Sequence, residues 1–145
     1  MSSKKAYLLC KRAEEMFEGA KWRLERGHYD LACFEAEQAA QLWIKCLAFE
    51  LWNEAPRLHD LNQLLGFIMR KLSLSGKEIS SFVDKFRQMR KDLWFLSESY
   101  YEARYEEVEY GSEEGERCLR IAEKVRKLVE EVRRAARGGV HDISA

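Results

Sequence analysis

The sequence has little of what interrupts or skews a globular chain. Its 145 residues include one proline and eight glycines, and 25 basic residues are balanced by 25 acidic ones. A chain that holds nucleic acid through its overall charge would be skewed basic, and a disordered acidic tail would be skewed the other way. The balance excludes both classes. A hydrophobic share of 46% at this length predicts one domain with a substantial core.

Long apolar runs and paired cysteines are missing too. No window approaches the roughly 18 apolar residues of a membrane span, and the N-terminal apolar run is too short for a signal peptide. None of the four cysteines belongs to a Cys-x-x-Cys pair, and the three histidines do not bracket them at zinc-finger spacing. We therefore expect no metal, no cofactor and a cytoplasmic protein. Three cysteines lie among apolar residues at helical spacing, which favours buried free thiols over disulfides: Cys10, Cys33 and Cys46.

A helical period is present along nearly the whole chain. Apolar residues recur every three or four positions, and no segment alternates like a strand. The period predicts helices over about residues 7–24, 30–52, 58–68, 79–101 and 113–137. The second segment is apolar around most of its circumference, so we expect it at the centre of the core. The prediction is an all-α domain over residues 1–145, a single antiparallel bundle of about five helices, with its core at about 5–137 and a tail at 138–145.

Local signals indicate where these helices begin and end. Asp30 is a good N-cap residue for the second helix. Ser75 and Glu78 have the Ser-x-x-Glu spacing of a capping box, which would open the fourth helix. The breaks before and after the last helix are expected at glycines: Gly111 and Gly115, then Gly138-Gly139.

Most enzyme motifs are absent. The chain has neither a phosphate-binding Gly-x-x-x-x-Gly-Lys-Ser/Thr loop nor a Gly-x-Ser-x-Gly nucleophile elbow. Glu25 and His28 have the Glu-x-x-His spacing of a di-iron bundle, but Gly27 interrupts the helix and the motif occurs once where two are needed. No metal site is predicted.

Several pieces of the sequence follow one another in an order typical of one family. Residues 27–45 contain Tyr29…Ala32…Phe34 followed by Glu37-Gln38-Ala39 and Lys45. After them come His59-Asp60-Leu61…Leu64-Leu65 and Tyr100-Tyr101-Glu102-Ala103-Arg104-Tyr105. In this order the pieces resemble the HEPN family, whose name abbreviates the higher-eukaryote and prokaryote nucleotide-binding domain, and residues 27–45 look like its second helix. Together the pieces span about residues 5–136.

The resemblance implies a bundle of four or five helices that usually dimerises and associates with nucleotides or RNA. Such proteins often occur beside a small nucleotidyltransferase in toxin–antitoxin pairs. Many members are metal-independent ribonucleases with an Arg-x(4–6)-His motif. In that motif a histidine that titrates near neutral pH acts beside an arginine of fixed charge.

This sequence departs from the active motif. A histidine is expected at position 109, 110 or 111 after Arg104, but Glu109, Tyr110 and Gly111 stand there. Glu109 or Tyr110 would be a poor replacement for imidazole as a general base. The spacing does occur from Arg23 to His28 and from Arg134 to His141, but both pairs lie outside the motif's position, and roughly one match is expected by chance. We therefore assign no catalytic residue.

The resemblance places a phosphate contact at Arg104, in a cleft where Tyr101 and Tyr105 could stack on a base. The alternative for Arg104 is an ion pair with Glu102, Glu106 or Glu107. Lys45 would bind an anion or an acidic partner, or extend to the surface. His59 joins the candidate site, although a capping or core-edge position also explains it. The four tryptophans are expected in the core or at a dimer interface.

The leading hypothesis is a homodimeric protein that binds a nucleotide or RNA phosphate, lacks the catalytic histidine and partners a nucleotidyltransferase. One alternative is a metal-independent ribonuclease acting through Arg104. The other is a purely structural protein–protein interaction module. Because the net charge is zero, any phosphate binding must rest on a few local residues.

Overall fold

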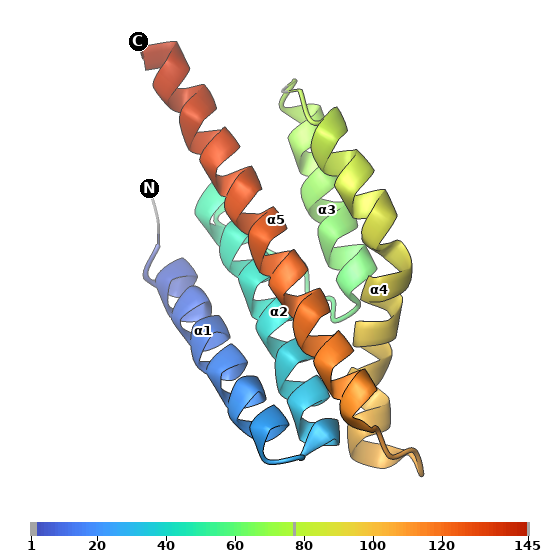
Figure 1. The fold of residues 1–145 in the computed structure, drawn as a ribbon. Helices are drawn as coiled ribbons and strands as arrows, with labels where there is room; N and C mark the ends of the chain where they lie inside the picture. Colours follow the sequence, from blue (N-terminus) through green and yellow to red (C-terminus); the bar gives the residue numbers. More distant parts are fainter. Residues whose placement is uncertain (1–2, 77, 145) are drawn as a thin grey trace.

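The computed structural model describes residues 3–76 and 78–144, including the side chains of all these except residues 100, 103, 104 and 139–144. Five helices and no strand occur in this part of the chain: α1 (Lys4–Glu25), α2 (Tyr29–Trp52), α3 (Leu61–Leu74), α4 (Ser80–Tyr105) and α5 (Ser112–Ser144). They form the predicted antiparallel bundle (Figure 1). Among the described residues, no helix is long and apolar enough to cross a membrane.

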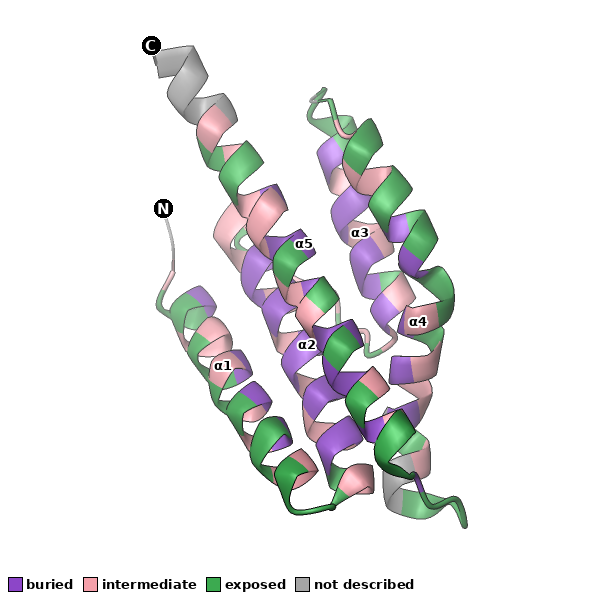
Figure 2. Ribbon diagram, viewed as in Figure 1, coloured by how far each residue is buried: buried purple, intermediate pink, exposed green. Residues whose placement is uncertain are grey.

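Helix α2 is the centre of the bundle, as expected. It packs against each of the other four helices. Its buried positions include the small residues Ala32, Ala36, Ala39 and Ala40, which let neighbouring helices approach closely. Figure 2 shows the buried positions concentrated on α2 and on the faces of α3 and α5.

The expectation of free thiols is wrong. Disulfides join Cys10 to Cys46, between α1 and α2, and Cys33 to Cys118, between α2 and α5. The Cα atoms of the two pairs are 5.4 and 5.2 Å apart, within the usual range for disulfides. Helical spacing places each cysteine on a core-facing stripe. It carries no information on the register between helices, and that register brings the cysteines into pairs.

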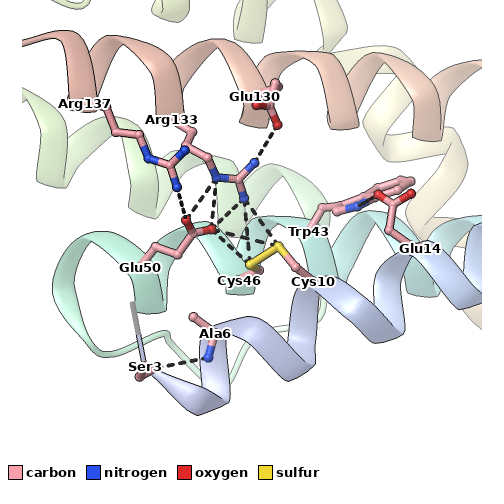
Figure 3. Close-up of a disulfide and its surroundings, with 10 residues drawn as sticks. All are labelled: Ser3, Ala6, Cys10, Glu14, Trp43, Cys46, Glu50, Glu130, Arg133 and Arg137. Atoms are coloured by element: carbon pink, nitrogen blue, oxygen red, sulfur yellow. Dashed lines mark hydrogen bonds and ion pairs between the residues drawn. A yellow bond between two sulfur atoms is a disulfide. The ribbon is translucent and has the colours of Figure 1, made fainter. Parts of the chain in front are cut away.

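The ion pair between Glu50 of α2 and Arg133 of α5 lies beside the first disulfide (Figure 3). Arg133 Nη2 donates to Glu50 Oε1 at 2.6 Å and Nε donates to Oε2 at 3.0 Å, while Nη1 donates to Glu130 at 2.6 Å. Burial lowers the pKa of Arg133, but the carboxylates of Glu50 and Glu130 outweigh burial and raise it above its ordinary value. We call α1, α2 and α5 the three-helix body, because both disulfides and this ion pair join them.

Helices α3 and α4 form an antiparallel pair, the α3–α4 hairpin, which contains no cysteine. The Asn62 side chain donates to the Arg90 carbonyl at 3.1 Å, and the Leu61 amide donates to Ser97 Oγ at 3.0 Å. Outside the apolar core, ion pairs with α5 hold α4 to the body, such as the pair of Lys85 with Glu131. The body and the hairpin are therefore stabilised by different kinds of contact.

Two helix starts lie within one residue of their predicted positions, but the predicted caps are wrong. Helix α2 begins at Tyr29, and Asp30 lies in its first turn, where the carboxylate accepts the backbone N–H of Tyr110 at 2.8 Å. Ser75 ends α3 and donates to the Leu72 carbonyl, while Glu78 separately accepts the amide of Ser80. The Ser-x-x-Glu spacing is thus divided between the end of one helix and the start of the next.

Three glycines expected at helix breaks lie inside α5: Gly115, Gly138 and Gly139. A Cβ on Gly115 would be 3.0 Å from side-chain atoms of both Leu24 and Tyr29, so glycine permits close packing there. Helix α5 also continues past Gly138 to Ser144. A glycine lowers helix propensity by about 1 kcal/mol but keeps its backbone donor, so it does not by itself end a helix.

Candidate functional site

Two exposed tyrosines mark the C-terminal end of α4. Tyr101 and Tyr105 are 53% and 64% exposed, and their ring centroids are 5.3 Å apart. Residues four apart share a helix face, so the rings form one aromatic surface. Arg104 belongs to the same turn of α4, but its side chain lies outside the described residues.

The surroundings of this surface are strongly acidic. Residues 92–116 contain one basic residue, Arg104, whereas eight glutamates occur between positions 98 and 116. Glu106, Glu107 and Glu109 are all exposed. Nearby carboxylates repel an anionic ligand, and this repulsion weakens with added salt. A phosphate held by Arg104 would have to overcome this local field.

Tyr110, at one of the three positions where the resemblance leads us to expect a histidine, is buried and forms structural contacts. Its hydroxyl donates to Glu102 Oε2 at 3.0 Å, and its ring stacks on Phe95. Burial, with further contributions from the hydrogen bond and charge of Glu102, raises the pKa of Tyr110 far above its ordinary value. The hydroxyl therefore stays protonated and cannot act as a general base near neutral pH.

Lys45 and His59 belong to a different group, a polar strip formed by α2 and the segment before α3. The fully buried carboxylate of Glu37 accepts Gln38 Nε2 at 2.9 Å and Gln41 Nε2 at 2.6 Å. Gln41 in turn contacts His59 Nδ1 at 3.4 Å. Burial lowers the pKa of the Lys45 amine, and the charge of Glu37 opposes the shift.

The predicted site residues thus fall into two groups. Tyr101 and Tyr105 lie with the backbone of Arg104 at the end of α4, and Lys45 and His59 lie along α2 and the segment before α3. The cationic strip residue, Lys45, has a partly compensating charge in Glu37. The predicted residues would therefore form two separate binding sites and not one.

The turn between α1 and α2 brings together residues to which sequence reasoning assigns little weight. Gly27 has φ of +75°, which reverses the chain and places Arg23 Nη1 3.2 Å from His28 Nδ1. A guanidinium only donates, so this contact requires Nδ1 to be the acceptor. The exposed ring of Trp22 lies under Arg26, 4.1 Å from the guanidinium carbon. This turn and the α4–α5 loop lie at the same end of the bundle (Figure 1).

The tryptophans divide between the core and the surface. Trp43 is buried and donates to Glu14 Oε2 at 2.9 Å. Trp22 and Trp94 are exposed. The core position therefore does not hold for these two rings, and their place at a dimer interface stays a prediction.

Comparisons with known proteins define the class of this domain. The sequence model of the HEPN domain matches residues 6–132, nearly the whole described chain. The protein belongs to the HEPN domain family. Among curated protein sequences, none is significantly similar to this chain.

Two solved structures are similar in fold. The crystal structure of TT1696 from Thermus thermophilus has a TM-score of 0.68 and 24% identity, over 89% of this chain and 98% of that one. The structure of ST0689, an archaeal HEPN homologue, has a TM-score of 0.63 and 23% identity over the same shares. At these identities the likeness establishes a shared bundle.

Proposed function

We propose that this HEPN domain protein binds the phosphate of a nucleotide or an RNA without cleaving it. The observation that carries the proposal is the pair of exposed tyrosines on the turn of α4 that contains Arg104. Planar rings stack on bases, and a guanidinium binds phosphate in a bidentate manner. Family membership supports the same ligand class.

Calorimetric titration with ATP, other nucleotides and short single-stranded RNAs tests the proposal. We expect heat of binding for the wild type and at least a tenfold weaker affinity for Arg104→Ala. Arg12→Ala is the matched control, because Arg12 is an exposed arginine on α1, a helix that does not pack against α4 in the described part of the chain. An absence of heat with every ligand, for the wild type and Arg104→Ala alike, would refute the proposal.

RNA cleavage is a second candidate function, and one contact favours it. Arg23 and His28 place a fixed positive charge beside an imidazole, the pair of groups that metal-independent RNA cleavage needs. Cleavage through Arg104 would instead require Glu109 as the base, since the pKa of Tyr110 is raised. Incubation of total RNA in EDTA with wild type, His28→Asn and Arg104→Ala separates the possibilities. RNA that stays intact with the wild type supports binding alone.

The proposal includes a homodimer in the cytoplasm and a small nucleotidyltransferase as partner. Disulfides persist inside cells mainly in hyperthermophiles, so a cytoplasmic location goes with a heat-tolerant protein. Light scattering tests the dimer. A nucleotidyltransferase gene beside this one, and co-purification of its product, test the partner. Co-purification with an unrelated protein, and no nucleotide binding, would favour a purely structural module instead.

A further inference from the structure

The α3–α4 hairpin carries a groove of about 600 Å³ between its two helices. Arg70 lines it from α3, and Arg87, Arg90 and Trp94 line it from α4. Met69 and Phe86, both largely buried, lie beneath them. This volume is in the range of small-molecule sites, and the residues exposed along it are mainly arginines and an indole.

The groove carries more positive than negative charge, since three arginines and one carboxylate line it. Arg70, Arg87 and Arg90 are exposed, and none forms an ion pair in the described part of the chain. The one acidic residue lining the groove is Asp60, whose carboxylate accepts the amide of Gln63 at 2.9 Å as the N-cap of α3. The groove therefore presents three cations in a protein of zero net charge.

Local packing positions two of the three guanidinium groups, those of Arg70 and Arg90. The Arg70 Nη1 atom lies 3.5 Å from where a Cβ on Gly66 would be, so Arg70 lies over the glycine along α3. The Arg90 guanidinium lies over the Phe86 ring, 5.6 Å from its centroid. The hydrogen bond from the Asn62 side chain to the Arg90 carbonyl joins the two walls of the groove.

Trp94 adds a flat apolar surface to the cationic groove. Its side chain is 60% exposed, and it lies four residues after Arg90, on the same face of α4. An exposed indole next to arginines suits a ligand that has both an aromatic ring and a phosphate. An acidic peptide would satisfy the arginines but would leave the indole without a planar partner.

We infer that this groove binds one or two nucleotide units of single-stranded RNA, or a free nucleotide, with phosphate on Arg87 and Arg90 and a base on Trp94. The inference shares its ligand class with the proposed function, but its site is separate from Arg104 and the tyrosine pair. The electrostatic contrast supports this separation, because eight glutamates surround Arg104 in the sequence, whereas a single carboxylate, Asp60, lines the groove beside three arginines.

Fluorescence anisotropy of a labelled eight-nucleotide RNA tests the groove in the full chain. We expect the R87Q/R90Q variant to bind at least tenfold more weakly and to reduce the slope of log affinity against log salt. Trp94→Leu should weaken binding severalfold. The control, R12Q/R120Q, removes the same charge from exposed sites on α1 and α5 and should change affinity less than threefold. Circular dichroism checks that each variant is folded.

The variants distinguish binding in the groove from binding at Arg104 and the tyrosine pair. Weak binding by R87Q/R90Q with unchanged binding by Arg104→Ala supports the groove and rejects the Arg104 site. The reverse pattern overturns the groove and leaves the proposed function standing. Equal losses in R87Q/R90Q and R12Q/R120Q, or no RNA binding by the wild type, also overturn it. Competition by ATP distinguishes a free nucleotide from a strand. Stronger competition by an eight-residue glutamate peptide would identify an acidic protein segment as the occupant and overturn the assignment.

Discussion

The three-helix body and the α3–α4 hairpin are stabilised in different ways. Two disulfides and the mostly buried pair of Glu50 with Arg133 join α1, α2 and α5. The hairpin meets the body through the apolar core and through surface ion pairs such as Lys85 with Glu131. Exposed ion pairs contribute little and are screened by salt. The difference teaches that the covalent links lie in the body, whereas the tyrosine pair and the arginine groove lie on the hairpin.

Removing the disulfides is the largest test of this comparison. They close segments of 36 and 85 residues, for which chain-entropy arguments give about 4 kcal/mol each. We expect Cys33→Ala/Cys118→Ala, or reduction by dithiothreitol, to lower the free energy of unfolding by several kcal/mol in a urea titration. RNA binding at 25 °C should persist, since the groove belongs to the hairpin. An unchanged unfolding midpoint would contradict the assigned pairing.

The ion pair beside the first disulfide gives the next effect. Arg133→Met leaves the mostly buried Glu50 carboxylate with the longer contact to Arg137, at 3.5 Å. Breaking one partner of a buried pair destabilises strongly, so we expect a loss of about 2–4 kcal/mol. The double variant Glu50→Gln/Arg133→Met should recover part of this loss. A double variant no more stable than the single one would show that the carboxylate is not the cause.

Two helical glycines, one in each part, should respond in opposite directions. At Gly115 a Cβ would crowd Leu24 and Tyr29 at 3.0 Å, so Gly115→Ala should destabilise by about 1 kcal/mol or more. At Gly66 the nearest atom is the flexible end of Arg70 at 3.5 Å, so Gly66→Ala should stabilise by about 0.5–1 kcal/mol. Thermal unfolding of the two variants measures both. If both substitutions changed the stability in the same direction, they would contradict the difference between tight packing at Gly115 in the body and open space at Gly66 in the hairpin.

Some of this organisation was predictable from the sequence, and some was not. The central position of α2 followed from its apolar composition, since a helix without a polar face must be buried on most sides. The disulfides did not follow, because the pairing of Cys33 with Cys118 depends on helix register across 85 residues. Asp30 looked like a cap because its chemistry suits one. The same carboxylate instead holds the amide of Tyr110, a contact across 80 residues.

The candidate site residues, too, were predictable from the sequence only in part. Motif resemblance placed Tyr101 and Tyr105 together on one turn, which helical spacing guarantees. The resemblance gave little weight to Arg23 and His28, because their spacing lies outside the family motif's position. The two side chains meet because Gly27, with positive φ, reverses the chain between them. The arginine groove was not predicted, because Arg70 and Arg87 come from two helices whose pairing only the fold defines.

The smallest effect concerns the junction between α4 and α5. The pKa of Tyr110 is raised in the folded state, so the protonated hydroxyl contributes stability that is present below the ordinary pKa of about 10 and is lost as pH rises above it. Urea titrations from pH 8.5 to 11 should show stability falling more steeply for the wild type than for Tyr110→Phe. Parallel curves would mean that the hydroxyl is not buried against Glu102.

RNA affinity as a function of salt tests the central claim most directly, that a protein of zero net charge holds phosphate through a few local cations. For binding by about three arginines, the slope of log affinity against log salt for a single strand should be about −2. We predict saturable binding of an eight-nucleotide RNA with a slope near this value, and with the RNA intact in EDTA. No binding at low salt, or an affinity independent of salt, would contradict the account.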